Sequence, residues 1–354
     1  MLRSSLTDVT KFIDRDPKRI SWNEADYNRL AKGTQYMFDT TVLRPSMYRP
    51  FSSQWAYFAP ELNQRTSQLG RLFPTPEHEN IGFYVNGFHA TAEFALLATD
   101  LIPCLDVFGK GGFFFPRYTY RELTVEGGFD FPDEDGGAAY ERVDNITDAT
   151  LAAYRKTYAD TDPGLTRDDI FFYVYGLLHS PAYREAYAAD LKKSLPRIPK
   201  VRGFRAFAEA GRQLAELHIG YESAKPFGGI VISLNNTRPD MPEADLFRVT
   251  KMKIPKTKGV QDRTRIVYNN HITLENIPEE AYEYQLGARS AIEWIIDRYQ
   301  VKTDPKSGIV NDPNDWSDDP RYIVYLLRRI VTLSLATVEI VRHLPPLDII
   351  EDAS

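Results

Sequence analysis

The 354-residue sequence contains a single cysteine, Cys104, in the apolar segment LIPCLDVF. One cysteine cannot form a disulfide within the chain, so the sequence favours a reducing, cytoplasmic setting. No apolar run approaches the roughly 20 residues that a membrane-spanning helix needs. The N-terminus also lacks the apolar core of a signal peptide. We therefore expect a cytoplasmic protein with no membrane partner.

Motifs of the common catalytic classes are also missing. The sequence has no G-x-x-x-x-G-K-[ST] phosphate loop, no G-x-G-x-x-G, no H-E-x-x-H and no paired C-x-x-C. The adenine methyltransferase signature N/D-P-P-Y/F is absent, and no (D/E)-x-K nuclease pattern follows Asp133 or Asp240. We therefore predict no catalytic residue, no metal site and no cofactor on this chain.

The chain has no excess of positive charge. Its 43 Lys and Arg residues face 49 Asp and Glu residues, which gives a formal net charge of −6. An isolated DNA-binding domain is usually basic, because neutralising phosphates dominates its affinity. This balance argues against a stand-alone DNA binder. It does not exclude a local positive cleft formed by cations gathered on one face.

Two features leave an enzymatic alternative open. His179 precedes Ser180, as in some hydrolases, but Pro181 follows and the glycine-flanked turn that exposes a nucleophile is absent. Asp304–Asp319 is rich in Asp and Asn, which are ligands that calcium accepts, but the spacing differs from an EF-hand. A helix-end histidine and a loop of turns before the last helix are the simpler interpretations.

The alternation of composition along the chain predicts an α+β protein of two packed subdomains. Short aromatic and β-branched runs with frequent Pro and Gly predict strands in the first part, and helical spacing dominates after Asn145. We place a junction near the acidic, glycine-rich segment 124–142. The predicted parts are a mainly β subdomain (1–140), a helical subdomain (141–225), a β-hairpin region returning to the first sheet (226–280) and C-terminal helices completing the helical subdomain (281–354).

Several elements are predicted individually. Thr147 should cap one helix, and Thr166 with Asp169 forms a capping-box pattern before another. The predicted helices cover 22–32, 148–158, 182–194, 204–217, 288–299 and 321–343, with strands at 54–58, 81–86, 113–120 and 229–234. Alternation over 247–254 and 264–268, with a basic turn between them, predicts a β-hairpin.

Cations are concentrated in this hairpin. The segment FRVTKMKIPKTKGVQDRTR has one acid, Asp262, against seven Lys and Arg residues. A hairpin with a basic tip can follow a phosphate backbone or enter a major groove. Lysines also protect an edge hairpin from aggregation, so a structural role stays open. The candidate DNA-binding residues here are Lys251, Lys253, Lys256, Lys258, Arg263 and Arg265.

A second set of candidates lies in the N-terminal strand region. Arg can read guanine through two hydrogen bonds, and Asn or Gln can read adenine in the same way. The same residue types also occur in solvated polar loops, so the two interpretations remain open. The candidates are Arg44, Arg49, Asn63, Gln64, Arg65 and Arg71, with Asn86 as a weaker member.

Several long motifs resemble one family. RPSMYRPFSSQW (44–55), DIFFYVYGLLHSPAYREAYAADLKKSLPRIP (169–199) and YQLGARSAIEWIIDRYQVKTDPKSGIVNDPNDW (284–316) are similar to the C-terminal target-recognition region of type ISP restriction–modification enzymes. Those are long polypeptides that join a nuclease, a helicase-type motor, an adenine methyltransferase and a DNA-reading domain. The resemblance spans nearly the whole chain.

The resemblance implies that this chain chooses a duplex DNA site and breaks no bond itself. Its partners would be duplex DNA and the methyltransferase and helicase domains of the same polypeptide or complex. S-adenosylmethionine, ATP and Mg would be bound only by upstream domains. The alternative is a structural module that docks to a methyltransferase and reads no DNA of its own.

Overall fold

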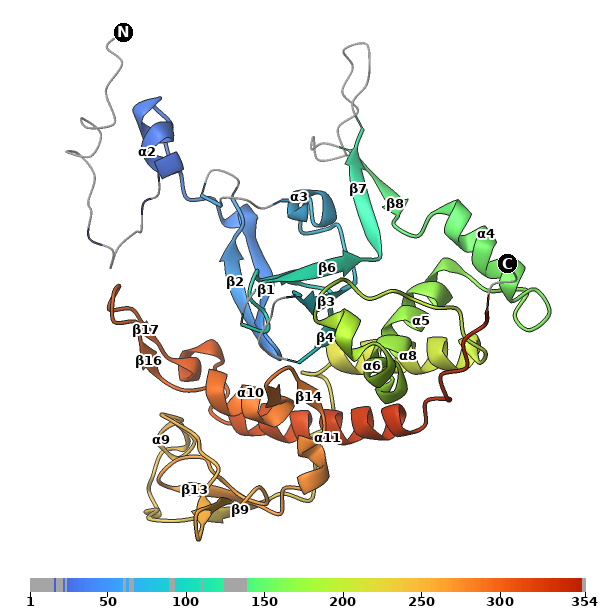
Figure 1. Ribbon diagram of the computed structural model, residues 1–354. Coiled ribbons are helices and arrows are strands. Elements are labelled where there is room, and N and C mark those ends of the chain that lie inside the picture. The colour runs from blue at the N-terminus through green and yellow to red at the C-terminus, as the bar shows by residue number, and fades with distance from the viewer. Residues whose placement is uncertain are drawn as a thin grey trace.

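A computed structural model describes residues 16, 22, 24–59, 62–63, 67–88, 93–109, 111–123 and 139–351 (Figure 1). Over these residues the chain combines helices with several small sheets, which confirms the predicted α+β class. The acidic, glycine-rich segment at the predicted junction lies mostly in 124–138, outside the described residues. The subdomain limits therefore stay predictions. No helix in the described ranges is long and apolar enough to cross a membrane.

Short strands dominate the N-terminal region. They form two three-stranded sheets, in the orders β2-β1-β5 and β4-β3-β6, and a β7–β8 hairpin. The predicted strand 113–120 is split at Arg117, whose buried guanidinium binds Asp144 and Asp168. The elements are α2 (Glu24–Ala31), η1 (Thr40–Val42), β1 (Leu43–Arg49), β2 (Ser52–Tyr57), α3 (Leu69–Leu72), β3 (Gly82–Asn86), β4 (Leu96–Thr99), β5 (Ile102–Pro103), β6 (Gly112–Pro116), β7 (Tyr118–Glu122) and β8 (Tyr140–Asp144).

Strand β3 lies between two hydrophobic cores. Successive side chains of a strand point to opposite faces. Phe83 and Val85 join the core formed with the helices of residues 148–219, whereas Tyr84 joins the larger core around the C-terminal helix. The neighbouring strand β4 alternates in the same way. The β region is therefore packed on the helical region, as the sequence predicts.

The helices begin at the predicted capping residues. Thr147 accepts a hydrogen bond from the backbone N–H of Thr150, and Thr166 with Asp169 forms a complete capping box. These side chains satisfy N–H groups that a first helical turn leaves unpaired. The helix predicted over 182–194 is instead two short helices, α6 and α7. The helices are α4 (Asp148–Thr157), α5 (Arg167–His179), α6 (Pro181–Ala186), α7 (Ala188–Leu191) and α8 (Phe204–Ile219).

Helices α5 and α8 touch backbone to backbone at two glycines. A Cβ atom at Gly176 would lie 2.2 Å from the carbonyl oxygen of Phe207. One at Gly211 would lie 1.9 Å from the carbonyl oxygen of Phe172. Both distances are far below van der Waals contact, so only glycine fits at this helix crossing.

The next region forms a sheet of its own, in the order β12-β13-β9. Among the described strands, none of these three pairs with a strand of residues 43–144. The two β regions share a hydrophobic core, to which Met47 and Ile272 both belong, but they share no sheet. The elements are β9 (Val231–Leu234), α9 (Glu243–Leu246), β10 (Lys256–Thr257), β11 (Val260–Gln261), β12 (Ile266–Val267), β13 (Ile272–Glu275) and η2 (Glu279–Tyr282).

The predicted basic hairpin is present with shorter strands. Lys253 and Val267 exchange two backbone hydrogen bonds, and β10 pairs with β11 around a tight turn. The turn residues Lys258 and Gly259 have φ of 52° and 86°. Positive φ at both central residues is the geometry whose twist matches a two-residue hairpin.

The strand predicted over 247–254 is wrong apart from the bridge at Lys253. Side-chain amides form hydrogen bonds with the backbone N–H and C=O groups that would otherwise pair with a neighbouring strand. The amide of Asn314 both accepts from Val249 N–H and donates to its carbonyl oxygen, and the amide of Asn269 donates to the carbonyl of Arg248. The alternating apolar pattern arises because Phe247 and Val249 are buried, although their segment forms no β-ladder with a neighbouring strand.

The C-terminal helices lie in the middle of the molecule. In Figure 1, α10 and α11 run between the β1–β2 ribbon above and the β9–β13 sheet below. Apolar side chains on nearly all sides of α11 are buried, as predicted, and the helix packs against α8, α10 and η2. The elements are β14 (Gln285–Leu286), β15 (Arg289–Ser290), α10 (Ala291–Arg298), β16 (Lys302–Thr303), β17 (Val310–Asn311), η3 (Pro313–Trp316) and α11 (Tyr322–Arg342).

A buried polar chain joins β4, α5, α8 and α11. The Tyr175 hydroxyl accepts from the backbone N–H of Ala98 and donates to His218 Nδ1 at 2.7 Å. His218 Nε2 then donates to Thr337 Oγ1 at 3.0 Å. Burial favours the neutral imidazole and lowers the pKa of His218 to about 3.

This buried imidazole predicts a loss of stability in mild acid. The unfolded chain binds a proton at His218 near its ordinary pKa of 6.5, whereas the folded chain does not until about pH 3. The contribution of neutral His218 to the free energy of unfolding is therefore fully present above about pH 6.5. It decreases as the pH drops, by about 2 kcal/mol at pH 5. Urea unfolding at pH 7.5 and 5.0 measures the loss. His218→Gln, which cannot titrate, should reduce the difference, and an unchanged difference would contradict the assignment.

Candidate nucleic-acid interface

Two of the N-terminal candidates are engaged in local contacts. Arg44 is 8% exposed, and its Nη1 donates to the carbonyl oxygens of Thr41 and Leu43. Arg49 Nη1 donates to the carbonyl of Tyr48, and its guanidinium stacks over the Tyr48 ring at 4.2 Å. These contacts leave little of either guanidinium free to reach a base edge.

The amide candidates are used in a similar way. Asn63 donates to the carbonyl oxygens of Tyr57 and Ala59, and the Asn86 amide donates to the carbonyl of Glu93 and accepts from the backbone N–H of Ala95. Arg71 is exposed at the end of α3. Gln64 and Arg65 lie outside the described residues. Roles in DNA binding for this set stay predictions.

The lysines of the basic segment are different. Lys251, Lys253, Lys256 and Lys258 are all exposed, and none has an ion-pair partner within the part of the chain that the structure describes. The β10–β11 pairing places Lys256 and Lys258 at the projecting end of the hairpin. Four uncompensated positive charges therefore occur within eight residues of a chain whose net charge is −6.

The two arginines of the segment have local partners. Arg265 forms an ion pair with Glu275 at 3.0 Å, and the guanidinium of Arg263 lies 5.3 Å from the centre of the Tyr282 ring. Both side chains are exposed. They can still approach an anion, but the lysines carry the larger free charge.

A second cationic group surrounds Asp297 at the end of α10. Arg298 binds this carboxylate directly, and Lys302 and Arg289 lie 3.7 and 3.9 Å from it. Burial acts against ionisation, but the hydrogen bond from Arg298 and the three positive charges hold the pKa of Asp297 below its usual value. One carboxylate cannot neutralise three cations, so a surplus of positive charge remains.

One backbone hydrogen bond joins the segments that carry these two cationic groups. The backbone N–H of Val301 donates to the carbonyl of Thr250 at 2.9 Å, and these residues precede Lys302 and Lys251 in the sequence. Arg248 also binds Asp312. We call the lysines 251, 253, 256 and 258, together with Arg289, Arg298 and Lys302, the basic surface. Residues 289–302 were not among the predicted binding residues, because helix and loop patterns alone did not single out their cations.

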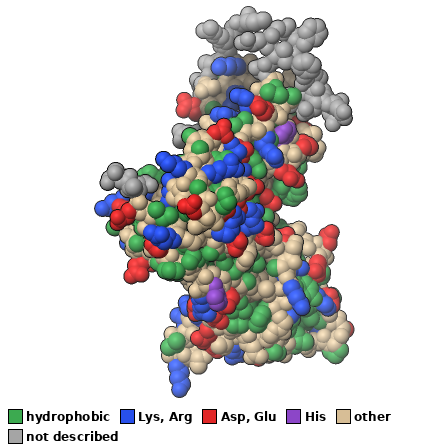
Figure 2. Space-filling view, turned by 90° about the vertical axis from the view of Figure 1, so that its right-hand side faces the viewer, with side chains coloured by type: hydrophobic (Ala, Val, Ile, Leu, Met, Phe, Trp, Pro, Cys, Tyr) green, Lys and Arg blue, Asp and Glu red, His purple; other side chains and the backbone are tan. Residues whose placement is uncertain are grey.

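Charge is distributed differently elsewhere. On the side that carries α4 and the C-terminus, Lys and Arg are interspersed with Asp and Glu (Figure 2). Most arginines there have acidic partners, such as Arg167 with Asp148 and Arg205 with Asp162. Such paired charges attract phosphate weakly.

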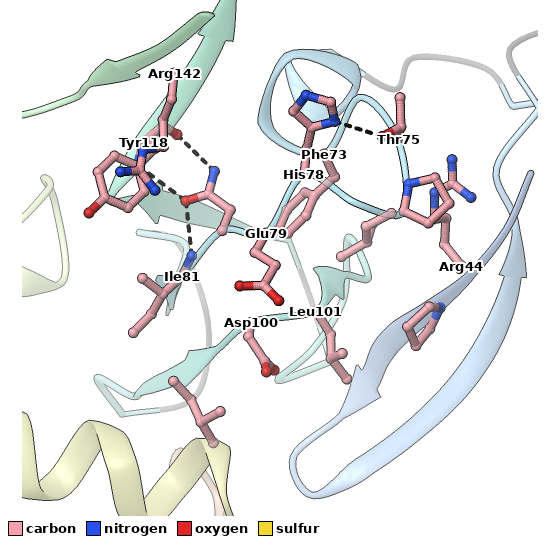
Figure 3. Close-up of a pocket in the computed structure, with 15 residues that line it drawn as sticks. Arg44, Phe73, Thr75, His78, Glu79, Ile81, Asp100, Leu101, Tyr118 and Arg142 are labelled. Carbon is pink, nitrogen blue, oxygen red and sulfur yellow. Dashed lines mark hydrogen bonds between the residues drawn. The ribbon is translucent and has the colours of Figure 1, made fainter. Parts of the chain in front are cut away.

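A cavity of about 470 Å³ lies beside β1 and β7. Its wall includes Arg44 and Arg142, and the side chains of Glu79 and Asp100 lie near one another in it (Figure 3). Burial raises the pKa of Asp100, and the Glu79 charge adds to this effect. The cavity combines two arginines with two carboxylates, so it lacks the surplus of positive charge that the basic surface has.

The residues of the enzymatic alternative are not brought together. His179 is buried at the end of α5 and donates from Nδ1 to the carbonyl of Tyr175, and burial lowers its pKa. Asp304 lies at the β16–β17 turn, on the opposite side of the molecule (Figure 1). In the described ranges no three His, Cys, Asp or Glu side chains are arranged to hold a metal.

The sequence and the fold are similar to those of known proteins. Residues 3–326 match the model of the Type ISP C-terminal specificity domain. A structure of a nuclease-deletion mutant of the Type ISP restriction–modification enzyme LlaGI, in complex with a DNA substrate mimic, has a TM-score of 0.79 and 37% identity over 99% of this chain. The structure of the ATP-dependent Type ISP restriction–modification enzyme LlaBIII bound to DNA has a TM-score of 0.80 and 35% sequence identity over 94% of this chain. The DrdV–DNA complex has a TM-score of 0.81 and 31% sequence identity over 98% of this chain. No curated protein sequence matches the chain.

The chain belongs to the Type ISP C-terminal specificity domain family. It spans 29% of the LlaGI chain, 20% of the LlaBIII chain and 32% of the DrdV chain. The resemblance inferred from the sequence motifs is therefore confirmed, and it concerns one part of much longer proteins.

Proposed function

We propose that this chain recognises a specific duplex DNA sequence as the target-recognition part of an ATP-dependent restriction–modification protein. The observation that carries the proposal is the basic surface, on which four lysines lack ion pairs and three cations share Asp297. Relatives with the same fold are bound to DNA or a DNA mimic.

The proposed mechanism divides the work between two kinds of contact. Lysine and arginine side chains bind phosphates, which releases condensed counterions and fixes the position of the protein on the duplex. Polar side chains then contact base edges, and these contacts supply the sequence preference. With roughly 6–10 phosphate contacts, binding should weaken steeply as salt rises. The acidic remainder of the chain would restrict DNA to the basic surface.

We infer that bond-breaking and strand translocation belong to other parts of such a protein. Nuclease, motor and adenine methyltransferase activities, with Mg, ATP and S-adenosylmethionine, would reside on domains outside this chain. The buried, backbone-bonded His179 and the separate position of Asp304 support a binding role for the chain itself.

Selection of bound sequences from random duplex DNA, at low and at physiological salt, tests the proposal. We expect one asymmetric motif to be enriched at both salt concentrations. A pool that stays random at physiological salt would contradict sequence recognition by the chain. If the chain instead binds a type ISP methyltransferase domain and enriches no DNA, the docking-module alternative is correct.

A further inference from the structure

The β16–β17 ribbon is built to hold its shape without a hydrophobic core. Lys302 pairs with Asn311 and Thr303 with Val310 across the two strands. The Asp304 carboxylate closes the turn by accepting from the backbone N–H groups of residues 306 and 307, at 3.0 and 2.6 Å, and from the hydroxyl of residue 307. The tip is therefore ordered by its own hydrogen bonds.

The ribbon exposes side chains that a purely structural turn would not need. It extends outward beyond α10 at the edge of the molecule (Figure 1). Ile309 and Val310 are 58% and 59% exposed, and Asn311 is exposed with no side-chain partner in the described residues. Because residues paired across a ribbon share a face, Lys302 and Asn311 lie on one face and Thr303 and Val310 on the other.

The charges around the ribbon favour an anionic partner. The negative charge of Asp304 is directed into the turn, and Arg248 binds that of Asp312. Lys306 at the tip has no ion pair within the described chain, and Lys302 belongs to the cation surplus around Asp297. Positive charge is thus free at both ends of the ribbon, while the carboxylates of Asp304 and Asp312 are occupied.

The inner face of the ribbon borders a cavity of about 430 Å³, shared with β1 and β2. Asn311, Lys302 and Ile309 line it from the ribbon, and Gln54 and Tyr48 line it from the opposite ribbon. Neither Asn311 nor Lys302 was predicted from the sequence to bind DNA, since two-residue strands are too short to show a period. Two amide side chains therefore border one recess next to the basic surface.

We propose that the β16–β17 ribbon enters the major groove of the target duplex and reads base edges through Asn311, with Val310 contacting a thymine methyl group. This rests on the proposed function. The major groove, about 12 Å wide, admits a two-stranded ribbon. An asparagine amide can bond both N6 and N7 of adenine, and aliphatic side chains contact the thymine methyl. Lys302 and Lys306 bind the flanking phosphates.

Asn311→Ala in the full chain tests this role against a matched charge variant. We measure affinities for the selected target duplex, its single-base-pair variants and an unrelated duplex. Asn311→Ala should reduce the preference for the target roughly tenfold and relax one base pair, while binding to the unrelated duplex is retained. Lys302→Ala should weaken binding to every duplex by a similar factor, because it removes a phosphate contact.

A second variant and a modified duplex test the opposite face. Uracil in place of thymine removes only the methyl group, and the unaltered chain should bind this duplex less tightly. Val310→Ser should bind the thymine and uracil duplexes alike. Thermal unfolding checks that the variants fold, which is expected because both side chains are exposed.

The outcomes separate the two levels of the proposal. If the Asn311→Ala and Val310→Ser variants keep the target preference of the unaltered chain, the ribbon assignment is wrong. Sequence recognition by the chain would still hold. An equal loss on all duplexes for Asn311→Ala would also overturn base reading by that residue. If the unaltered chain prefers no duplex, the proposed function itself fails and the ribbon assignment fails with it.

Discussion

Alanine at Lys251, Lys253, Lys256 and Lys258 together should weaken binding to duplex DNA roughly thousandfold at about 0.1 M salt. Each lysine–phosphate contact contributes about 0.9 to the slope of log K against log salt. Loss of four contacts should therefore make the slope shallower by about 3 to 4. Fluorescence anisotropy titrations over a series of salt concentrations give both quantities.

The fold should tolerate this four-lysine variant, because all four side chains are exposed and unpaired within the described residues. A matched control carries alanine at four exposed lysines outside the basic surface, Lys32, Lys156, Lys193 and Lys225. It changes the net charge by the same amount and should keep most of the affinity and the slope. Equal losses in both variants would mean that only overall charge matters. Unchanged DNA binding, with lost binding to a methyltransferase domain, would support the docking-module alternative.

Gly211→Ala should destabilise the fold by about 3 kcal/mol or prevent folding. The added methyl group would lie 1.9 Å from the carbonyl oxygen of Phe172 and 2.7 Å from the backbone nitrogen of Gly176. Both obstacles are backbone atoms of a neighbouring helix, so α5 and α8 must separate and open the core between them. Urea unfolding of the variant and the unaltered chain measures the difference.

Gly70→Ala provides the matched control for the helix crossing. Gly70 lies in α3, and a Cβ atom there would have no neighbour within 4 Å. Alanine also has a better helix propensity than glycine, so this variant should be as stable as the unaltered chain or slightly more stable. A loss below about 1 kcal/mol for Gly211→Ala would show that the two helices are not fixed at this contact.

Elements specified by local chemistry were predictable from the sequence. The caps at Thr147 and Thr166 were correct, because a hydroxyl followed by suitable residues satisfies the first helical N–H groups wherever it occurs. The long apolar pattern over 321–343 likewise predicted α11. These signals need no knowledge of distant residues.

Elements specified by distant partners were not predictable. The alternation at Phe247 and Val249 indicated a strand, but Asn314, more than sixty residues later, binds the Val249 backbone. The ribbon around Lys302 and Val310 has two-residue strands, so its sequence shows only a polar loop. Tertiary context overrides local pattern in both places.

Only part of the candidate site was predictable, because the fold decides which individual side chains stay free. Lysines crowded within eight residues are visible in the sequence, and the structure leaves them exposed. Whether a single Arg or Asn is free depends on the fold. Arg44 became buried and the Asn86 amide became bonded to the backbone of Glu93 and Ala95, whereas Asn311 remained available. Composition can therefore indicate a phosphate-binding segment, but it cannot select the base readers.

Hydrogen exchange of backbone amides, measured with and without the selected target duplex, locates the DNA contact on the protein. We expect DNA to slow exchange in residues 251–261 and 301–311 and to leave α4 and α5 unchanged. Slower exchange confined to the helices of residues 148–219, with the basic surface unaffected, would contradict this expectation.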